Sequence, residues 1–291
     1  MLDADQELDA GSRAELRQLV QTSRTRGYML RQLNYVDRTG NASILEHGVV
    51  RLFPNLPAIK YVGAVHEQIV SLDPVVPFTL ASCGVILHHE GFRPQHRDVK
   101  ANARRDVKIL KLMYSNDPDN AFTSFNLGQS CQILEQPEEA ARWFAQCVAL
   151  AELPQEGNDL PSYILNARME LSRCLLTLGR LAEALVVAQE AVEQAPTSPD
   201  AHAVLGAAYT INGQLDDALN EYLTITQLPP AEIGAPADRS LSTWRGLLGL
   251  GQVLVLQKRR IEALEVLEQA WRQSNGHESV SPWLEAAQQL N

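Results

Sequence analysis

Hydrophobic and polar residues follow two different patterns along this chain, and the pattern changes near residue 97. Before that point, one amphipathic helix is predicted at residues 12–24, with Ser12 as its N-cap and Glu15 three residues later. Short runs of β-forming residues follow, each bounded by Pro, Gly, Asn or Asp. They predict four strands, at residues 27–37, 44–54, 59–70 and 78–89. Four strands after a single helix are typical of the second half of an α/β domain.

After residue 97 the pattern is almost entirely helical, and it repeats. Four anchor alanines define the repeat: Ala140, Ala184, Ala218 and Ala263. Twelve residues before each anchor stands a leucine followed by a small residue, in the pairs Leu127-Gly128, Leu171-Ser172, Leu205-Gly206 and Leu250-Gly251. Small residues at this position let two helices approach closely, while larger residues four positions after the anchor fill the gap. The pattern predicts a series of helix–turn–helix units.

The anchors recur at intervals of 44, 34 and 45 residues. The unit resembles the tetratricopeptide repeat, whose period is about 34 residues. Inserts rich in Pro and Gly, at residues 151–161 and 229–240, account for the two longer intervals and are predicted to be loops. Residues 281–291 are predicted to form a capping helix that covers the apolar edge of the last repeat.

Composition narrows the possible functions. The chain has 291 residues, of which 45% are hydrophobic and 21% charged, with a net charge of −10. Nucleic acids and anionic membranes are therefore poor partners. No secretory signal and no uncharged run long enough to span a bilayer are found, so a cytoplasmic protein is expected. The four cysteines lack metal-ligand spacing and are interpreted as reduced core residues.

Four segments carry chemistry in a recognisable order: "LDADQEL", "RLFPNLPAIKYVGAVHEQI", "VILHHEGF" and the helix "KANARRDVKILKLM" that leads into the repeats. This succession resembles the family-two glycosyltransferases of the GT-A fold, in the subgroup whose catalytic domain is followed by tetratricopeptide repeats. The resemblance implies an α/β fold, a partial GT-A mixed sheet representing the second half of the domain only, followed by an all-α tetratricopeptide-repeat solenoid.

The resemblance also implies a metal site. In this family an Asp-x-Asp pair binds Mn²⁺ or Mg²⁺, which neutralises the diphosphate of a nucleotide-sugar donor. The matching residues here are Asp3 and Asp5, and the late histidine that completes the site is His89. The family commonly has glutamate where this chain has Gln6. Terminal, solvated carboxylates are the alternative interpretation of the aspartate pair.

The remaining site residues follow from the same resemblance. Glu67 is expected to be the general base that takes a proton from the acceptor hydroxyl, with His66 as the alternative base or an orienting neighbour. Arg51 and His88 are expected to contact the donor phosphates. Each also has a plain structural interpretation: an ion pair at a strand end for Glu67 with His66, and a polar pair at a strand end for His88 with His89.

The predicted organisation is a partial glycosyltransferase domain at 1–97, a linker helix at 98–118 and a repeat array at 119–291. The family's donor-base-binding half is expected to precede Asp3, so the chain alone is expected to be weakly active or inactive. The predicted function is metal-dependent transfer of a sugar, with inversion, from a nucleotide-sugar to an unknown acceptor. The alternative is a protein-interaction scaffold that binds a protein or peptide in the repeat groove. Candidates to line that groove, if they are not simply packed, are Phe122, Phe125, Met169 and Leu248.

Overall fold

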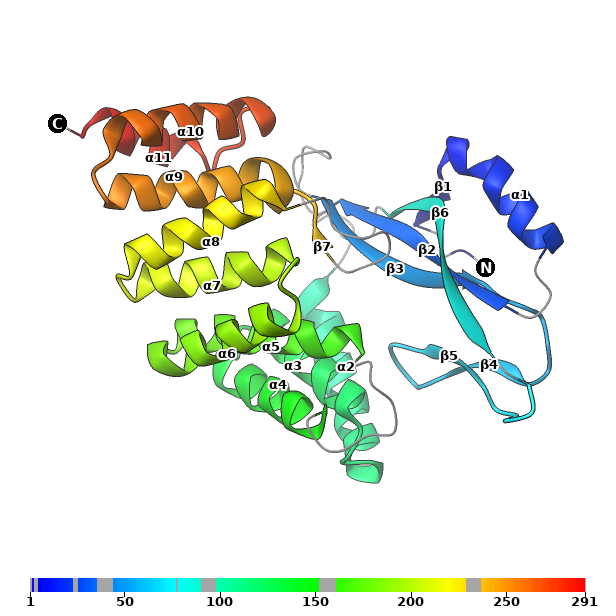
Figure 1. Ribbon diagram of the computed structural model, residues 1–291. Coiled ribbons are helices and arrows are strands. Elements are labelled where there is room, and N and C mark those ends of the chain that lie inside the picture. The colour runs from blue at the N-terminus through cyan, green and yellow to red at the C-terminus, as the bar shows by residue number, and fades with distance from the viewer. Residues whose placement is uncertain are drawn as a thin grey trace. The chain divides into compact units, whose positions relative to one another are not determined.

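The structure is a computed structural model of the chain. It describes residues 2, 5–22, 26–35, 44–76, 78–89, 98–151, 161–228 and 237–290. These residues divide into two compact units. The first comprises residues 1–98 and 232–237, and the second comprises residues 99–231 and 238–291. Figure 1 shows the helices and strands of both units.

A five-stranded mixed sheet forms the first unit, with the strand order β1-β6-β2-β3-β7. Its central pair, β2 and β6, is parallel, whereas β1 pairs antiparallel with β6 and β3 pairs antiparallel with β2. The strands are β1 (Gln6–Leu8), β2 (Arg26–Tyr35), β3 (Ile44–Leu52), β6 (Thr79–His89) and β7 (Ala237–Asp238). The second half of the GT-A fold stays a prediction for this small mixed sheet.

The apolar core of the first unit is small. Alternate residues of β2 and β6 point to the same face of the sheet, and Leu30, Val85 and Leu87 pack together there with at most 3% exposure. Leu16 and Leu19 of α1 (Arg13–Thr22) pack against this cluster. The runs of β-forming residues thus predicted β2, β3 and β6, and the alternation along β2 and β6 explains which face is buried.

The start of α1 differs from the prediction. A short 3₁₀ turn, η1 (Ala10–Ser12), precedes the helix, and the N-cap of this turn is Asp9. Ser12 is therefore the last residue of the turn and not a cap. Ser12 Oγ accepts a hydrogen bond from Ile86 N at 2.9 Å, and Glu15 Oε1 accepts one from Gly84 N at 2.8 Å. The backbone N–H groups of Ile86 and Gly84 lie in the part of β6 that does not pair with β1. Both side chains therefore satisfy donors that an open strand edge would otherwise leave unpaired.

The predicted strand at 59–70 is also wrong as a single strand. It is a hairpin of β4 (Ile59–Val62) and β5 (Gln68–Ser71), which form a separate two-stranded sheet. Gly63, in the intervening turn, has a φ of +110°, a conformation that glycine adopts without a steric penalty. The turn replaces the middle of the predicted strand.

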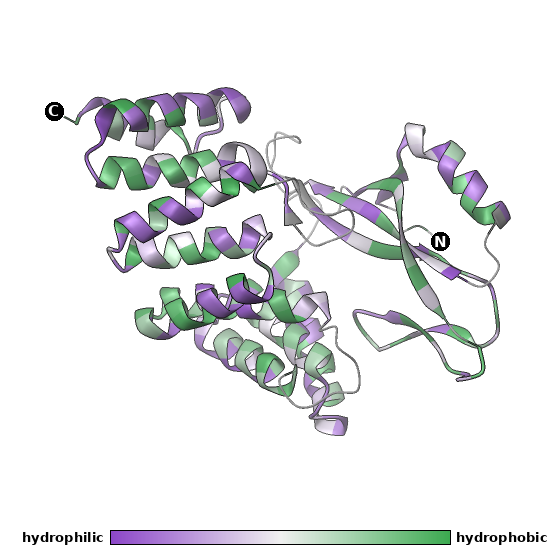
Figure 2. Ribbon diagram, in the orientation of Figure 1, coloured by the Kyte–Doolittle hydropathy of each residue, from purple (hydrophilic) through white to green (hydrophobic). Residues whose placement is uncertain are grey.

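Helices form the second unit, and they pair as predicted. The helix α2 (Val99–Asn116) leads into four hairpins, and α11 (Ser281–Gln288) follows the last of them. The hairpins are α3 (Ala121–Ile133) with α4 (Pro137–Ala151), α5 (Ser162–Thr177) with α6 (Leu181–Gln194), α7 (Pro199–Ile211) with α8 (Leu215–Gln227), and α9 (Gly246–Leu256) with α10 (Arg260–Gln273). These helices carry both hydrophobic and hydrophilic residues (Figure 2).

The small residues of the repeat permit the close helix approach that the sequence predicts. A Cβ atom on Gly128 would lie 2.7 Å from the ring of Phe144, and one on Gly251 would lie 2.5 Å from Leu267. In the second hairpin, Ser172 takes the small position and its Oγ donates a hydrogen bond to the Ala184 carbonyl oxygen at 2.9 Å. The glycine and its large partner therefore form one packing unit.

Other features of the second unit also follow the sequence. Trp283 and Leu284 of α11 pack against the core of the last hairpin, as expected of a capping helix. All four cysteines of the chain are buried and free, and burial raises the pKa of Cys147 to about 12. Of the predicted loops, residues 152–160 and 229–236 lie outside the described residues. None of the described helices is both long and apolar enough to cross a membrane.

Candidate functional site

Asp5 and His89 lie next to each other in the five-stranded sheet. Asp5 directly precedes β1, and the antiparallel register places Gln6 opposite His89 at the end of β6. This register brings Asp5 Oδ2 to 3.2 Å from His89 Nε2. Asp3, the third predicted metal ligand, lies outside the described residues. Two of the three predicted ligands are thus adjacent, although their role stays a prediction.

A chain of buried polar side chains holds the His89 ring. His89 Nδ1 lies 2.6 Å from Asn34 Oδ1, so a hydrogen atom must lie between them because an amide oxygen can only accept. Gln32 Nε2 donates to the same oxygen at 2.9 Å, and Gln6 Nε2 donates to Gln32 Oε1 at 2.7 Å. Asn34 is only 1% exposed. Gln32 Nε2 also lies 3.0 Å from His89 Nδ1, so two buried amides hold this side of the ring while Nε2 faces Asp5.

His47 extends this network to β3. Asn34 Nδ2 donates a hydrogen bond to His47 Nδ1 at 2.8 Å. Burial, followed by the nearby charges of His89 and Arg51, lowers the pKa of His47. A neutral His47 can accept the Asn34 hydrogen bond, which a doubly protonated ring could not. Arg51, which was predicted to contact phosphate, is therefore within electrostatic reach of the network.

Gln32, Asn34 and His47 were not among the predicted site residues. In "RQLNY" the polar residues Gln32 and Asn34 stand at positions where the alternation of β2 continues the buried face of Leu30. Buried amides are unfavourable unless they are hydrogen-bonded, so polar residues on the core face of a strand indicate a built polar site. The polar residues on the buried face of β2 were therefore the sequence signal from which this site could have been predicted.

His88 points to the opposite face of the sheet from His89, because neighbouring residues of a strand alternate. Its Nδ1 lies 2.6 Å from the Tyr35 hydroxyl, and the two rings stack with centroids 5.9 Å apart. Its Nε2 lies 3.4 Å from Asp9 Oδ1, and this hydrogen bond lowers the pKa of Asp9. The predicted phosphate contact thus lies on the other face from the Asp5–His89 pair.

Glu67 and His66 lie in the turn of the β4–β5 hairpin. Both are exposed, and His66 has a φ of +54°, in the left-handed region that is uncommon for residues other than glycine. The turn belongs to the two-stranded sheet, whereas Asp5 and His89 belong to the five-stranded sheet. The role of Glu67 as general base stays a prediction.

The geometry of the Asp5–His89 pair suits two neighbouring ligands of one metal ion. Ligands at right angles around Mg²⁺, each about 2.1 Å from it, are about 3 Å apart, close to the 3.2 Å measured here. Within the described part of the chain, no group of three or more His, Cys, Asp or Glu side chains is arranged to hold a metal. The pair would need further oxygen ligands from elsewhere.

A second candidate site lies on the repeat unit. Phe125, Met169 and Leu248, which were candidates for a groove, are at most 9% exposed and belong to the helix cores, as their packing interpretation predicts. The exposed apolar residues of the first helices are different ones. They stand six positions after the leucine of each Leu-small pair, and they are Ile133 (41% exposed), Ile211 (55%) and Leu256 (46%). Thr177 takes the equivalent position in α5. We call these four positions the aliphatic ladder.

Comparison with known proteins supports the repeats most clearly. A family model described as tetratricopeptide repeat matches residues 175–232. The crystal structure of MamA is similar to this chain with a TM-score of 0.48 and 18% identity, covering 62% of this chain and 96% of MamA. TTC0263, a thermophilic TPR protein of Thermus thermophilus, is similar with the same TM-score and identity, covering 65% of this chain and 91% of that protein. Residues 175–232 of this chain thus match the tetratricopeptide repeat.

The chain also has a weaker similarity to two curated proteins that are named glycosyltransferases. The chain is 24% identical over 98 residues to the SPbeta prophage-derived glycosyltransferase SunS of Bacillus subtilis (strain 168), and equally to glycosyltransferase SunS of Bacillus phage SPbeta. The match covers 34% of this chain and 23% of either relative. The chain therefore spans about a quarter of the length of the curated relatives that it matches.

Proposed function

We propose that the repeat unit binds a protein partner, and that the aliphatic ladder is the contact surface. The observation that carries the proposal is that exposed aliphatic residues, Ile133, Ile211 and Leu256, occupy the same position in three of the four repeats. Single exposed aliphatic residues are ordinary on protein surfaces. Equivalent positions of stacked repeats lie along one strip, however, and the third and fourth repeats place Ile211 and Leu256 next to each other on it.

Site-specific photo-crosslinking in the organism that encodes the chain tests this proposal. A benzophenone amino acid would replace Ile133, Ile211 or Leu256 in turn. Val186 is the matched control, because it is equally exposed, at 53%, but lies on α6, the second helix of its hairpin. We expect the same discrete protein adduct from the ladder positions and none from Val186. Equal labelling from all four positions, or none from the ladder, would contradict the proposal.

A second candidate function is participation of the first unit in sugar transfer. It is favoured by the Asp5–His89 pair together with the partial similarity to SunS. Asp5 and His89 would hold Mn²⁺ or Mg²⁺, with Asp3 as a further ligand, and Arg51 would add positive charge. When bound, the ion would neutralise the diphosphate of a nucleotide-sugar leaving group. Glu67, or His66 in its place, would accept the proton of the attacking hydroxyl. The acceptor and the sugar are not specified by this chemistry.

Metal binding can be measured without any assay of transfer. Titration calorimetry with Mn²⁺ should give binding that falls at least tenfold in Asp5→Asn and in His89→Gln. The control is His88→Gln, because His88 lies on the other face of the sheet. If the original chain binds Mn²⁺ and neither Asp5→Asn nor His89→Gln weakens this binding, the pair does not hold the metal. Hydrolysis of a nucleotide-sugar, compared with and without Mn²⁺, then tests the catalytic part separately.

A further inference from the structure

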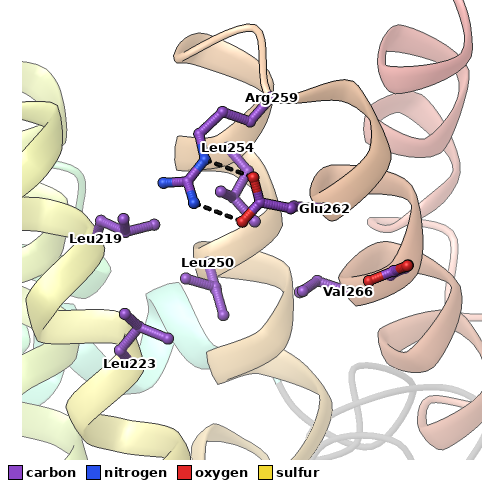
Figure 3. A pocket seen from close by; sticks show the side chains of 8 residues that line it. Leu219, Leu223, Leu250, Leu254, Arg259, Glu262 and Val266 are labelled. Atoms are coloured by element: carbon purple, nitrogen blue, oxygen red, sulfur yellow. Dashed lines mark hydrogen bonds and ion pairs between the residues drawn. The ribbon is translucent and has the colours of Figure 1, made fainter.

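An apolar groove opens between α8 and α10, with α9 as its floor (Figure 3). Leu250 and Leu254 form the floor, Leu219 and Leu223 form the α8 wall, and Val266 lies on the α10 wall. The groove has a volume of about 220 Å³. It is smaller than a site for a drug-sized ligand, which occupies roughly 300 Å³ or more. Its size therefore suits one large aliphatic or aromatic side chain.

The equivalent place one repeat earlier is closed. Aligning the repeats on their anchor alanines puts Gln189 of α6 and Tyr209 of α7 at the positions of Leu223 and Leu254. Gln189 Nε2 donates a hydrogen bond to Tyr209 Oη at 3.1 Å, so these two side chains join across the space. Leu223, by contrast, keeps 38% of its surface exposed. The groove between α8 and α10 thus differs from the equivalent place one repeat earlier.

The rim of the groove is acidic. Arg259 forms two hydrogen bonds with Glu262, Nε to Oε1 at 2.8 Å and Nη2 to Oε2 at 2.5 Å, which Figure 3 shows at one end of the groove. Asp216 accepts a hydrogen bond from Gln257 at 2.8 Å and, after Glu262, adds to the raised pKa of Arg259. Glu265 is a further carboxylate on the lining. Three carboxylates and one guanidinium leave an excess of negative charge.

We propose that this groove binds a segment of a protein partner that inserts one leucine- or phenylalanine-sized side chain and carries lysine or arginine beside it. Burying the anchor removes apolar surface of both molecules from water, which supplies affinity. Positive neighbours match the carboxylates of the rim, which favours this class of partner over acidic segments. A second copy of this chain is a poorer occupant, because each copy has a net charge of −10. The proposal does not rest on the aliphatic ladder, whose residues are different.

Three short fluorescent peptides form the probe set. The first has one leucine between two pairs of lysines, the second has alanine in place of leucine, and the third has glutamates in place of the lysines. Fluorescence polarisation should give at least tenfold tighter binding for the first peptide than for either twin. In methyl NMR spectra, the first peptide should shift the resonances of Leu219, Leu223 and Leu254. Equal binding of all three peptides, or no binding of the first, would overturn the proposal.

The preceding repeat supplies a variant that closes the groove. Leu223→Gln combined with Leu254→Tyr copies its Gln189–Tyr209 pair and should reduce binding of the leucine–lysine peptide at least tenfold. The matched control Val186→Gln places the same polar residue on another exposed helix position and should leave binding unchanged. Unchanged binding by the closed-groove variant would overturn the assignment.

A separate variant covers the case in which closing the groove disturbs folding. Glu265→Lys alters only the rim, and it should weaken binding of the lysine peptide and strengthen binding of the glutamate peptide. No change in either affinity would contradict the proposed charge match. Analytical ultracentrifugation completes the test. A concentration-dependent dimer that the Leu223→Gln/Leu254→Tyr variant abolishes would assign the groove to a second copy and overturn the peptide proposal.

Discussion

The two units of this protein bury apolar and polar side chains in different proportions. In the sheet unit, Gln32, Asn34 and His89 are at most 8% exposed and are linked by hydrogen bonds. In the repeat unit, the interior is built from alanines, leucines and large residues such as Phe144, which is fully buried. Apolar packing is tolerant and repeats easily, whereas a buried polar network holds only if every member finds its partner. The repeat interior therefore explains stability, and the sheet network marks a place where a specific arrangement is maintained.

The largest effect is expected where apolar packing is densest. Phe144→Ala should lower the free energy of unfolding of the repeat unit by about 4 kcal/mol, because it removes a buried ring and leaves a cavity beside Gly128. All four tryptophans, Trp143, Trp244, Trp271 and Trp283, lie in this unit, so their fluorescence in urea reports on it. Val186→Ala, at an exposed position, should change stability by less than about 0.5 kcal/mol. Similar losses for both variants would contradict the packing account.

The sheet network should be nearly as sensitive, but through hydrogen bonds. Asn34→Leu leaves the hydrogen of His89 Nδ1 and the acceptor of His47 without Asn34, at an expected cost of about 3 kcal/mol. Hydrogen exchange of β2 and β6, followed by mass spectrometry, should become faster, while tryptophan fluorescence of the repeat unit stays unchanged. Asn34→Asp keeps an acceptor for His89 and should cost less. A leucine variant with unaltered exchange would show that the network does not stabilise the sheet.

A buried acid in the repeat unit sharpens the comparison. Burial raises the pKa of Asp200 to about 6, although the backbone N–H of Asp238 donates to its carboxylate at 3.1 Å. The native state thus holds this proton more tightly than the unfolded state, so stability falls as the pH rises from about 4 to 6. Asp200→Asn should remove this loss. The stability advantage of this variant, about 3 kcal/mol above pH 7, should vanish below pH 4.

Urea titrations at several pH values would measure the difference between Asp200→Asn and the original chain. The exposed Val186→Ala, which alters no titratable group, is the control. A constant difference between Asp200→Asn and the original chain across the whole range would place the effect in packing instead of ionisation.

The smallest expected effect comes from a histidine, and its stability contribution also falls as the pH rises. His202 Nδ1 lies 2.6 Å from Glu221 Oε2 and its Nε2 lies 2.9 Å from the Pro196 carbonyl oxygen, so the charged ring donates to both. The hydrogen bond to Glu221 is the main reason that the pKa of His202 is raised. This stabilisation is complete below pH 6.5 and is lost as the pH rises through the raised pKa. Glu221→Gln should flatten this decline, as seen in unfolding at pH 6 and pH 9. A variant that keeps the full decline would rule out the pair as its cause.

Much of the repeat unit could be predicted from the sequence alone. The interval of twelve residues between each small residue and its anchor alanine predicted four hairpins, and the Gly128–Phe144 and Gly251–Leu267 contacts confirm the reason for that interval. Helical repeats make mostly local contacts, so nearby residues in the sequence contain the information. Of the site, the sequence supplied Asp5 and His89 only through a resemblance to known enzymes.

The tertiary structure decided what depends on residues far apart in the chain. Ser12 and Glu15 looked like a helix cap, but they bind the backbone of β6, more than 60 positions away. Asn34 could be seen in the sequence as a polar residue in a strand, yet its contact with His89 exists only because β2 and β6 pair in parallel register. Strand register and the choice of buried partner are set by long-range pairing. The sequence therefore determined which elements form, and the sheet determined which of their side chains meet.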